Sequence, residues 1–418
     1  MTGNPDSRTE FLLALARALH VSGYPAHRLE AVLVAAAESL SVEAQFFSTP
    51  TSLFAAVGRE AEQRTHLLRV EPGNVHLERL DLLLGVAATV RAGKLSPAAG
   101  VERIRAIMGA PPRWRGLTWI LAAAISSSCA ARFLGGGVME VFGAFVVGLG
   151  VAMLLQWSRR HPSLGRILAP LAGFLAALIA GLLAARVAPT SVPVVLVGGL
   201  IALVPGFMLT VATTELSAGH LVSGTARMAG AVVQLLSMII GLAVGLAMMT
   251  RLVGPFPPAF LIPLPAVTEV MAIFLAPITL AIVLQAAPGN FGWIVLIAVV
   301  GFAGGRLGAM TLGPELGLLV GALAASLLNN LLARIRPDHG ASDLVPGLIM
   351  LVPGSVGFRS LTELLDRNVL SGVDLAFRTA LMSSALSAGI ILANALIPAR
   401  PLTSPNAAGS RDESNEPI

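Results

Sequence analysis

The sequence predicts an α-helical polytopic membrane protein of about ten transmembrane helices, arranged as two inverted five-helix repeats that follow a small cytoplasmic α+β domain. Three observations carry this prediction. The 418 residues are 55% hydrophobic and 12% charged, with a mean hydropathy of +0.80, whereas soluble proteins have roughly 25% charged residues. Residues 1–116 hold 24 charges, but residues 117–400 hold only 23. One eleven-residue segment of the apolar part occurs twice.

The N-terminal α+β domain is predicted over residues 1–112. Apolar positions recur at helical spacing between residues 9 and 43, interrupted by the turn signal Gly23-Tyr24-Pro25. Segments rich in Phe, Val and Thr then predict strands, and two further helices follow, the second capped by Ser96 and Pro97. The strands are expected within 42–57 and 65–70, and the helices within 76–91 and 96–108.

The remaining chain divides into apolar segments near the roughly 20 residues that a bilayer crossing requires. The first five-span repeat is expected over residues 113–257 and the second over 258–400, and a polar tail over 401–418 is expected to be disordered. The ten predicted spans are 117–134, 138–157, 167–187, 192–213, 227–250, 269–287, 291–310, 313–333, 343–357 and 374–397.

The charges and the single cysteine exclude several classes of function. With the N-terminal domain inside, nine arginines flank the inner ends of the spans and six the outer ends, in the sense of the positive-inside rule. The first ten residues lack the pattern of a signal peptide, so the N-terminal domain is expected in the cytoplasm. Scattered arginines without aromatic neighbours argue against nucleic-acid binding. Cys129 stands alone, and neither a metal nor another cofactor is expected.

An internal repeat organises the membrane part. Residues 196–206 read LVGGLIALVPG and residues 344–354 read LVPGLIMLVPG, with nine identities in eleven positions at an offset of 148 residues. The same offset aligns Glu215 with Glu363. Because five spans is an odd number, the second copy must enter the bilayer from the opposite side. Inverted repeats of this kind are typical of secondary transporters.

The repeated segment ends in a Pro-Gly pair that predicts a broken helix in each half. Proline removes a backbone donor and glycine relaxes the backbone, so carbonyl and amide groups become free to meet a polar ligand. Such breaks mark the substrate site of transporters with inverted repeats. The substrate-binding candidates at and near the breaks are Pro205, Gly206, Thr210, Pro353, Gly354 and Ser355.

Several short motifs, in fixed order over residues 9–397, together resemble the threonine/serine exporter family. They are Ser22-Gly23, Arg28 with Glu30, Ser48-Thr49-Pro50-Thr51, Arg113-Trp114, Gly135-Gly136-Gly137, Leu203-Val204-Pro205-Gly206, Gly219-His220, Ser223-Gly224, Ala226-Arg227 and Leu351-Val352-Pro353-Gly354-Ser355. The single-chain form of this family is similar to a fusion of two proteins that some bacteria encode separately.

The resemblance implies a carrier of the bacterial inner membrane that exports threonine and serine and is driven by the proton motive force. The partners it implies are the amino acid, protons and the lipid bilayer, and homo-oligomerisation stays open. The two-protein form of the family is associated with succinate export, so a dicarboxylate exporter is the alternative within transport.

Ionisable groups in or beside spans are costly in hydrocarbon and are therefore functional candidates. Glu215 and Glu363 follow each Pro-Gly pair by nine residues and are the first candidates for the coupled proton. The alternative is that both lie in connecting helices and face water. Glu140 and Glu315, near the starts of two spans, are the second pair, although a carboxylate there also suits a helix N-terminus.

Two arginines in the membrane part and four histidines in the N-terminal domain are the remaining candidate functional residues. Arg227 and Arg378 are candidates for binding a substrate carboxylate, or they neutralise a glutamate. In the N-terminal domain, His20, His27, His66 and His76 with nearby hydroxyl groups would fit a membrane-tethered hydrolase or sensor. No nucleophile elbow, P-loop or HExxH motif fixes such a site, so an enzyme is not expected.

Overall fold

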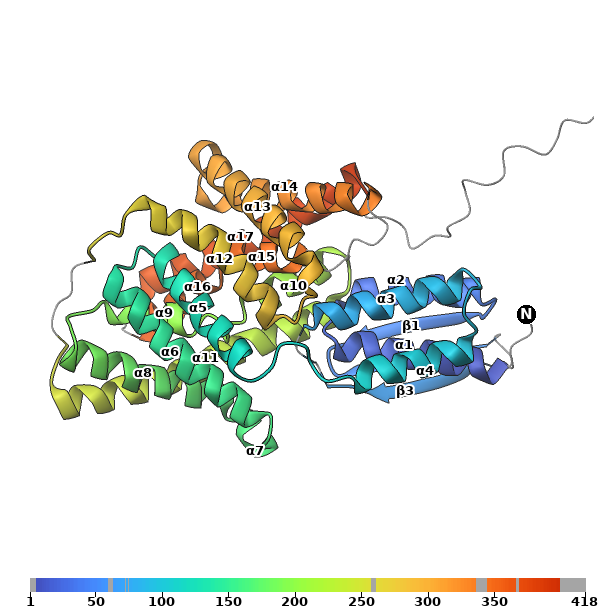
Figure 1. Cartoon of the computed structure of the whole chain (residues 1–418), viewed down its shortest axis with the longest axis horizontal. Coiled ribbons are helices and arrows are strands. Elements are labelled where there is room, and N and C mark those ends of the chain that lie inside the picture. The colour runs from blue at the N-terminus through green and yellow to red at the C-terminus, as the bar shows by residue number, and fades with distance from the viewer. Residues whose placement is uncertain are drawn as a thin grey trace, which may run out of the picture.

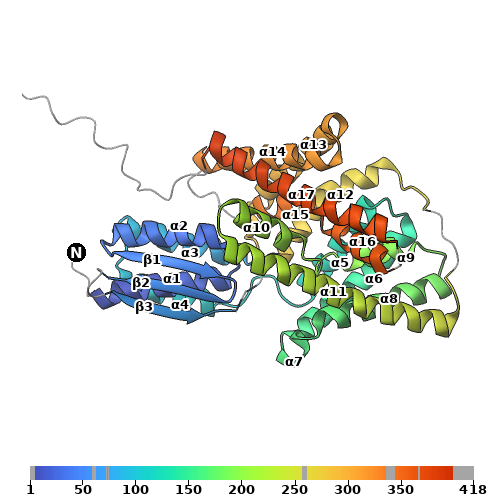
Figure 2. The same ribbon diagram turned by 180° about the vertical axis from the view of Figure 1, so that it is seen from behind.

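The computed structural model describes residues 5–58, 63–71, 73, 75–256, 261–335, 344–365 and 368–398. Two parts are visible, an N-terminal unit (residues 5–109) and a helical bundle (residues 117–396), with the unit placed at one end of the bundle in both views (Figures 1 and 2). The predicted disordered tail, 401–418, lies outside the described residues.

The N-terminal unit packs four helices against a three-stranded antiparallel sheet of order β1-β2-β3. Along the central strand, Leu53, Ala55 and Val57 alternate toward the core. The same core contains Phe11 of the first helix and Leu33 of the second. The segment 42–57, expected to be a strand, makes two strands, because the chain turns at Pro50-Thr51. The elements are α1 (Pro5–Val21), α2 (Ala26–Ser39), β1 (Ala44–Thr49), β2 (Ser52–Val57), β3 (Arg64–Arg69), α3 (Leu77–Arg91) and α4 (Pro97–Gly109).

The bundle is built from two runs of helices that match along the sequence. The first run is α5 (Leu117–Phe133), α6 (Val138–Ser158), the short α7 (Pro162–Gly165), α8 (Leu168–Arg186), α9 (Val192–Gly199), α10 (Gly206–Ser217) and α11 (Leu221–Val253). The second is α12 (Ala266–Val283), the 3-10 turn η1 (Pro288–Asn290), α13 (Phe291–Leu312), α14 (Pro314–Ile335), α15 (Leu344–Leu351), α16 (Gly354–Leu365) and α17 (Val369–Leu396).

Eight helical segments of the described chain are long and apolar enough to cross a membrane. They are α6, α8, α11, α12, α13 with η1, α14, α15 joined to α16, and α17. The apolar α5 has 17 residues and is shorter than these, and the pair α9 and α10 divides the fourth predicted span. The chain is therefore a mostly helical, multi-span membrane protein.

Two pairs of corresponding helices begin at the sequence offset of the repeat. α10 and α16 each have 12 residues and start 148 residues apart, as do α11 and α17. The packing partners correspond as well, because α8 lies against α11 and α14 lies against α17. Hydroxyl groups join the runs, with Thr213 Oγ1 2.8 Å from Ser387 Oγ.

Glycines let the helices of the bundle approach closely. A Cβ added to Gly241 of α11 would lie 1.8 Å from the carbonyl oxygen of Pro170 in α8, and one added to Gly173 of α8 would lie 2.0 Å from that of Met238. In hydrocarbon, where apolar burial gives little drive for association, such backbone proximity is what holds helices together.

We expect Gly241→Ala to destabilise the bundle by about 1–3 kcal/mol, because its methyl group forces α8 and α11 apart. Gly230→Ala is the matched control on the same helix, since the nearest atom to its added Cβ is the Met208 sulfur at 4.0 Å. Thermal unfolding of both variants in detergent measures the difference. Equal melting temperatures would show that the α8 and α11 contact tolerates the extra volume.

Candidate functional site

The two helix breaks predicted from the repeat meet in space. Residues 200–205 separate α9 from α10, which begins at Gly206 directly after Pro205, and residues 352–353 separate α15 from α16, which begins at Gly354 directly after Pro353. A Cβ added to Gly206 would lie 2.9 Å from the Cα of Gly354. The two backbones therefore cross at a point where neither carries a side chain, and any other residue would separate them.

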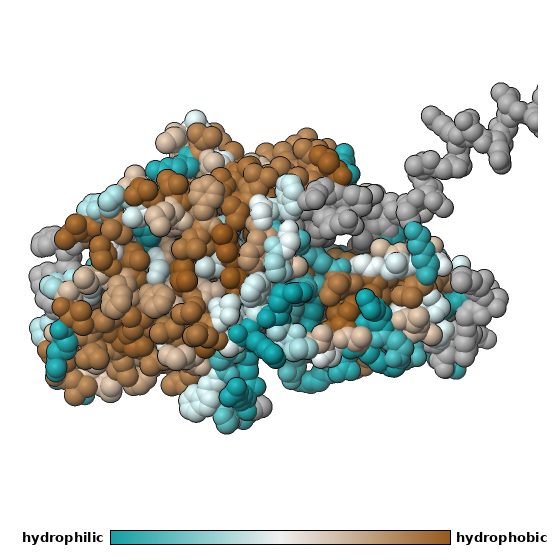
Figure 3. All heavy atoms as spheres, in the orientation of Figure 1, coloured by the Kyte–Doolittle hydropathy of each residue, from teal (hydrophilic) through white to brown (hydrophobic). Residues whose placement is uncertain are grey.

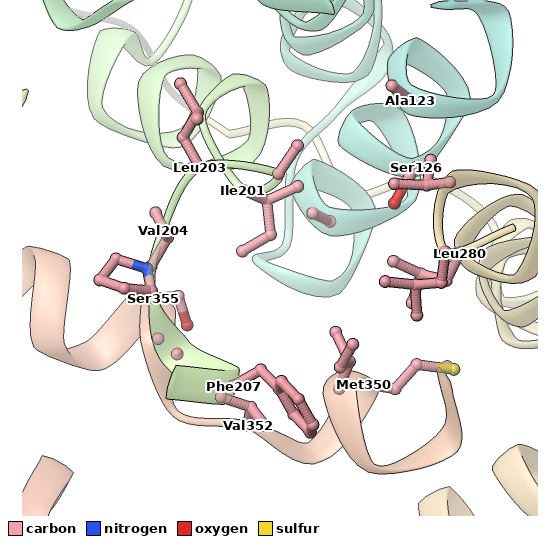
Figure 4. Close-up of a pocket in the computed structure, with 18 of the residues that line it drawn as sticks. Ala123, Ser126, Ile201, Leu203, Val204, Phe207, Leu280, Met350, Val352 and Ser355 are labelled. Carbon is pink, nitrogen blue, oxygen red and sulfur yellow. The ribbon is translucent and has the colours of Figure 1, made fainter. Parts of the chain in front are cut away.

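A cavity of about 420 Å³ lies against this crossing and takes residues from both halves of the bundle. Figure 4 shows side chains of α5, α12, α15 and the two breaks arranged around the open space. Its walls are mostly apolar, as in binding sites for small molecules. The side chains with polar or charged groups among the lining residues are Trp119, Ser126, Arg159, Gln234 and Ser355.

The helix ends at the break supply charge of both signs. The first residues of α10 and α16 line the cavity, and the N-terminus of a helix carries roughly half a positive charge. The residues that follow the C-terminus of α9, including Ile201, also line it, and that end of a helix is negative. The Leu203 carbonyl accepts a bond of 2.7 Å from Gln234 Nε2. A ligand with one positive and one negative group fits these surroundings.

Arg159 is the charged residue among those that line the cavity in the described chain. It caps the C-terminus of α6, and its guanidinium carbon lies 4.9 Å from the centre of the Trp119 ring. Trp119 is itself fixed, because its Nε1 donates to the Val283 carbonyl at 3.0 Å. In the sequence, Arg159 is one of the nine arginines that flank the inner ends of the predicted spans. Because Arg159 is far from both Pro-Gly pairs in the sequence, no local pattern predicted that it would line the cavity.

The substrate-binding candidates separate into two groups. Pro205, Gly206, Gly354 and Ser355 line the cavity, and Pro353 lies within the second break without being a lining residue. Thr210 is one turn further along α10, where its hydroxyl donates to the Gly206 carbonyl at 3.3 Å. The two candidate arginines are not lining residues: Arg227 pairs with Glu215, and Arg378 pairs with Glu315 and Asp374.

Glu215 is the most enclosed of the candidate carboxylates. Its side chain has no exposed surface, and Arg227 donates to it from Nε and Nη2, both at 3.1 Å. Ser223 donates through its hydroxyl at 2.8 Å, and the backbone N–H of Ala26 donates at 3.1 Å. Ala26 belongs to the N-terminal unit, so this carboxylate joins the two parts of the molecule. We call these four residues the Glu215 contact.

The other candidate glutamates have local partners. Glu140 is buried and accepts from the backbone N–H groups of Gly137 at 2.9 Å and Ser191 at 2.8 Å, which closes the start of α6. Glu315 pairs with Arg378 at 3.0 Å. Glu363 accepts from Asn368 Nδ2 at 2.9 Å and is partly exposed. None of the three is a lining residue of the cavity. Their predicted part in proton coupling stays a prediction.

The N-terminal unit also meets the second half of the bundle. The N–H groups of Leu77 and Glu78, at the start of α3, donate to the carbonyls of Leu284 and Gln285. Gln285 has a positive φ of 61° and exchanges two hydrogen bonds with the backbone of Trp114. Leu77 packs in an apolar cluster with Ala281, Ala286 and Ile294. We call this the Gln285 contact.

The N-terminal unit reaches the cavity through Val75, which is one of its lining residues. Figure 3 shows hydrophobic residues over most of the bundle, and more hydrophilic residues on the N-terminal unit and along the border between the two. The described chain has no group of three or more His, Cys, Asp or Glu side chains placed to hold a metal ion.

Two family models match the chain. One is described as a putative threonine/serine exporter and matches residues 10–249, and the other, described as a threonine/serine exporter, matches residues 269–396. No solved structure matches the chain.

The curated relatives are membrane proteins of fungi or are uncharacterized. An uncharacterized protein of Schizosaccharomyces pombe is 22% identical over 384 residues, which are 88% of this chain and 49% of the relative. Pheromone-regulated membrane protein 10 of Candida albicans is 23% identical over 401 residues, 92% of this chain and 35% of the relative. Its namesake in Saccharomyces cerevisiae is 24% identical, over 84% of this chain and 46% of the relative. The chain thus spans less than half the length of these relatives.

A cysteine at position 355 tests the cavity. With Cys129 replaced by alanine, we expect Ser355→Cys to react with a small methanethiosulfonate reagent in detergent, because Ser355 lines the open space. Ser326→Cys is the control, since Ser326 is 1% exposed within α14. Mass spectrometry of the two variants after the same labelling time measures the difference. An unmodified Ser355→Cys would mean that the cavity is closed to water.

Proposed function

The chain belongs to the threonine/serine exporter family, and we propose that it exports threonine and serine across the membrane as a secondary transporter. The observation that carries the proposal is the cavity at the crossing of the two broken helices. Amino acids are small zwitterions, and this cavity combines a modest volume with helix ends of both signs.

The proposed binding mode follows from the charges around the cavity. The substrate carboxylate meets the N-terminal amides of α10 and α16 and the guanidinium of Arg159. The ammonium group meets the carbonyls that follow α9. Ser126, Gln234 and Ser355 are lining residues with hydrogen-bonding groups suited to a side-chain hydroxyl such as that of threonine or serine. Such pairing compensates the loss of hydration that a zwitterion suffers in an apolar site.

The proposed mechanism is alternating access between two inverted halves. The matching helix bounds and matching helix pairs support a duplicated scaffold. Because each half contributes one break to the cavity, rotation of one half against the other would move the opening while the substrate stays at the crossing. The cavity reaches Val75, so the N-terminal unit lies at one end of the proposed path.

For location, we propose the cytoplasmic membrane of a bacterium, with the N-terminal unit inside. The distribution of arginines at the span ends supports this orientation. Export then means that substrate enters the cavity from the side of the N-terminal unit. The proton motive force, which brings protons inward, is the proposed source of energy.

A dicarboxylate such as succinate is the second candidate substrate. Arg159 and two positive helix ends could hold two carboxylates, which favours this alternative over other small metabolites. Succinate has no ammonium group, so in this alternative the negative end of α9 has no partner in the substrate.

Efflux from proteoliposomes tests the function. Vesicles are loaded with labelled threonine, serine or succinate, and release is measured with and without an imposed pH gradient. We expect the gradient to stimulate release of the two amino acids and to leave succinate inside. Release of succinate alone would replace the first proposal with the second, and release of none of the three would refute both.

Arg159→Gln should raise the KM for threonine about 10- to 100-fold, because a hydrogen bond to a charged group contributes roughly 1.5–3 kcal/mol. The neighbouring Arg160→Gln is the matched control, since Arg160 is exposed like Arg159 but is not a lining residue. Concentration-dependent efflux gives KM and the maximal rate separately. If both variants behave alike, Arg159 takes no part in binding.

As the site of the coupled proton we propose Glu215 rather than Glu363, Glu140 or Glu315. Among these four carboxylates, Glu215 alone has no exposed side-chain surface and binds the N-terminal unit. We expect Glu215→Gln to lose the stimulation by a pH gradient while it still exchanges labelled for unlabelled threonine. Glu363→Gln is the control at the repeat-equivalent position. Full stimulation of Glu215→Gln would move the proton site elsewhere.

A further inference from the structure

The N-terminal unit touches both halves of the bundle at once. The Glu215 contact joins it to α10 and α11 of the first half, and the Gln285 contact joins it to the end of α12 in the second half. Figure 2 shows α10 and α11 running up to the N-terminal unit. A body bound to both halves opposes any rotation of one half against the other.

The two contacts differ in chemistry. The Gln285 contact combines backbone hydrogen bonds with an apolar cluster, and it lies beside the covalent link from α4 to α5. The Glu215 contact depends on one buried carboxylate that holds an N–H group at the start of α2. It has no apolar cluster across it among the described residues. The Glu215 contact is therefore the one that can open while the other persists.

We propose that the N-terminal unit is a clamp across the two halves, and that the Glu215 contact is the latch that opens when the transporter changes state. This inference rests on the proposed transport function for what the latch controls. The latch sits well placed for this role, because α10 carries Glu215 near one end and Gly206, at the cavity, at the other. Holding α10 through Glu215 therefore holds one wall of the substrate site.

Other titratable groups surround the latch. The α2 residues His27, Arg28 and Glu30 face it from the N-terminal unit, together with His20 of α1, and Arg227 and His220 face it from the bundle. The rings of His27 and His220 are 6.1 Å apart, and His220 Nδ1 lies 3.7 Å from Glu30 Oε2. His27 Nδ1 is buried without a hydrogen-bond partner. The latch therefore closes over the His27 ring, whose buried Nδ1 has no acceptor for a second proton.

Acid should open the latch through His27. Burial first, and then the nearby Arg28, lower the pKa of His27 from its ordinary 6.5 to about 4, while Glu215 opposes the shift. When the latch opens, His27 loses its neighbours in the bundle and its pKa rises toward the ordinary value. Protons then bind the open form more tightly between pH 6.5 and about 4, so the closed form loses stability as the pH falls through this range.

The neighbours of His27 do not all act in the same direction. Burial lowers the pKa of His20 as well, so His20 adds to the effect of acid. Burial raises the pKa of the Glu30 carboxyl, so protonation of Glu30 favours the closed form. The contribution of His27 to the pH dependence of the closed form must therefore be separated from those of His20 and Glu30 by substitution of His27.

Amide hydrogen exchange reads the latch directly in the intact protein. The Ala26 amide reports the Glu215 contact, and the Leu77 and Glu78 amides report the Gln285 contact. We expect Glu215→Gln to lower protection at Ala26 at all pH values and to leave Leu77 and Glu78 protected. Glu140→Gln, at a buried glutamate that accepts two backbone amides within the bundle, is the matched control. Unchanged protection at Ala26 in Glu215→Gln would refute the latch.

The same measurement tests the effect of acid. After correction for intrinsic exchange, protection at Ala26 should fall about tenfold between pH 7.5 and pH 5.5, because the second value lies one unit below the ordinary pKa of histidine. His27→Gln should remove most of this fall. His76→Gln is the control, since burial lowers the pKa of His76 to about 4 as well, but His76 caps α3 at the other contact. A fall that persists in His27→Gln would refute the assignment to His27.

A cross-link connects the latch to transport. In the Cys129→Ala background, His27→Cys with His220→Cys can be joined by a short, reducible bifunctional reagent. Joining them should abolish threonine efflux, and reduction should restore it. Transport that continues in fully cross-linked protein would refute the clamp. If no form transports any substrate, the proposed function fails, but hydrogen exchange at Ala26 still decides whether the latch exists.

Discussion

The contact between Gly206 and Gly354 is the constraint on which the site depends. Two helices of the bundle, α10 and α16, begin directly after a proline, and their first residues are glycines that cross each other, where an added Cβ would lie about 3 Å from backbone of the other half. Helix ends brought this close expose amides and carbonyls that no helix can satisfy. In an apolar environment such groups persist only beside a cavity or in protein contacts. The crossing thus explains both the position of the cavity and its charge.

Close backbone approach also explains how the rest of the bundle holds this arrangement. α8 and α11 touch through Gly173 and Gly241, and α14 and α17 touch through Gly389, whose added Cβ would lie 2.5 Å from the Leu319 carbonyl. Each half is thereby packed as a compact set of helices. The halves meet along α5 and α12, where Cys129 packs with Ala272 and Ala276, and also at the breaks and through hydroxyl groups such as Thr213 and Ser387. The polar contacts among these can exchange partners with little loss of packing, which suits movement between halves.

The sequence predicted what depends on local pattern and missed what depends on distant residues. Helical spacing, caps and the repeat located the elements and the Pro-Gly breaks, because each is written in a few neighbouring residues. The place of Arg159 beside Trp119 arises from the packing of α6 on α5, and a basic residue at a span end looks the same whether it meets lipid headgroups or a cavity. Likewise, the carboxylate of Glu215 is held by an amide 189 positions earlier in the chain, which no periodicity reveals.

The two copies of the repeat resemble each other more in the positions of their helices than in the residues around Glu215 and Glu363. This difference concerns the place where the N-terminal unit binds. The offset that aligns Glu215 with Glu363 aligns Arg227 with Leu375, so the second copy lacks the cation that compensates a buried carboxylate. Glu363 is accordingly partly exposed and bound to Asn368, whereas Glu215 is enclosed. A buried charge without a partner would cost several kcal/mol. The Arg227 pair is therefore what allows the first copy to place a carboxylate under the N-terminal unit, and it makes one half of a duplicated scaffold the site of docking.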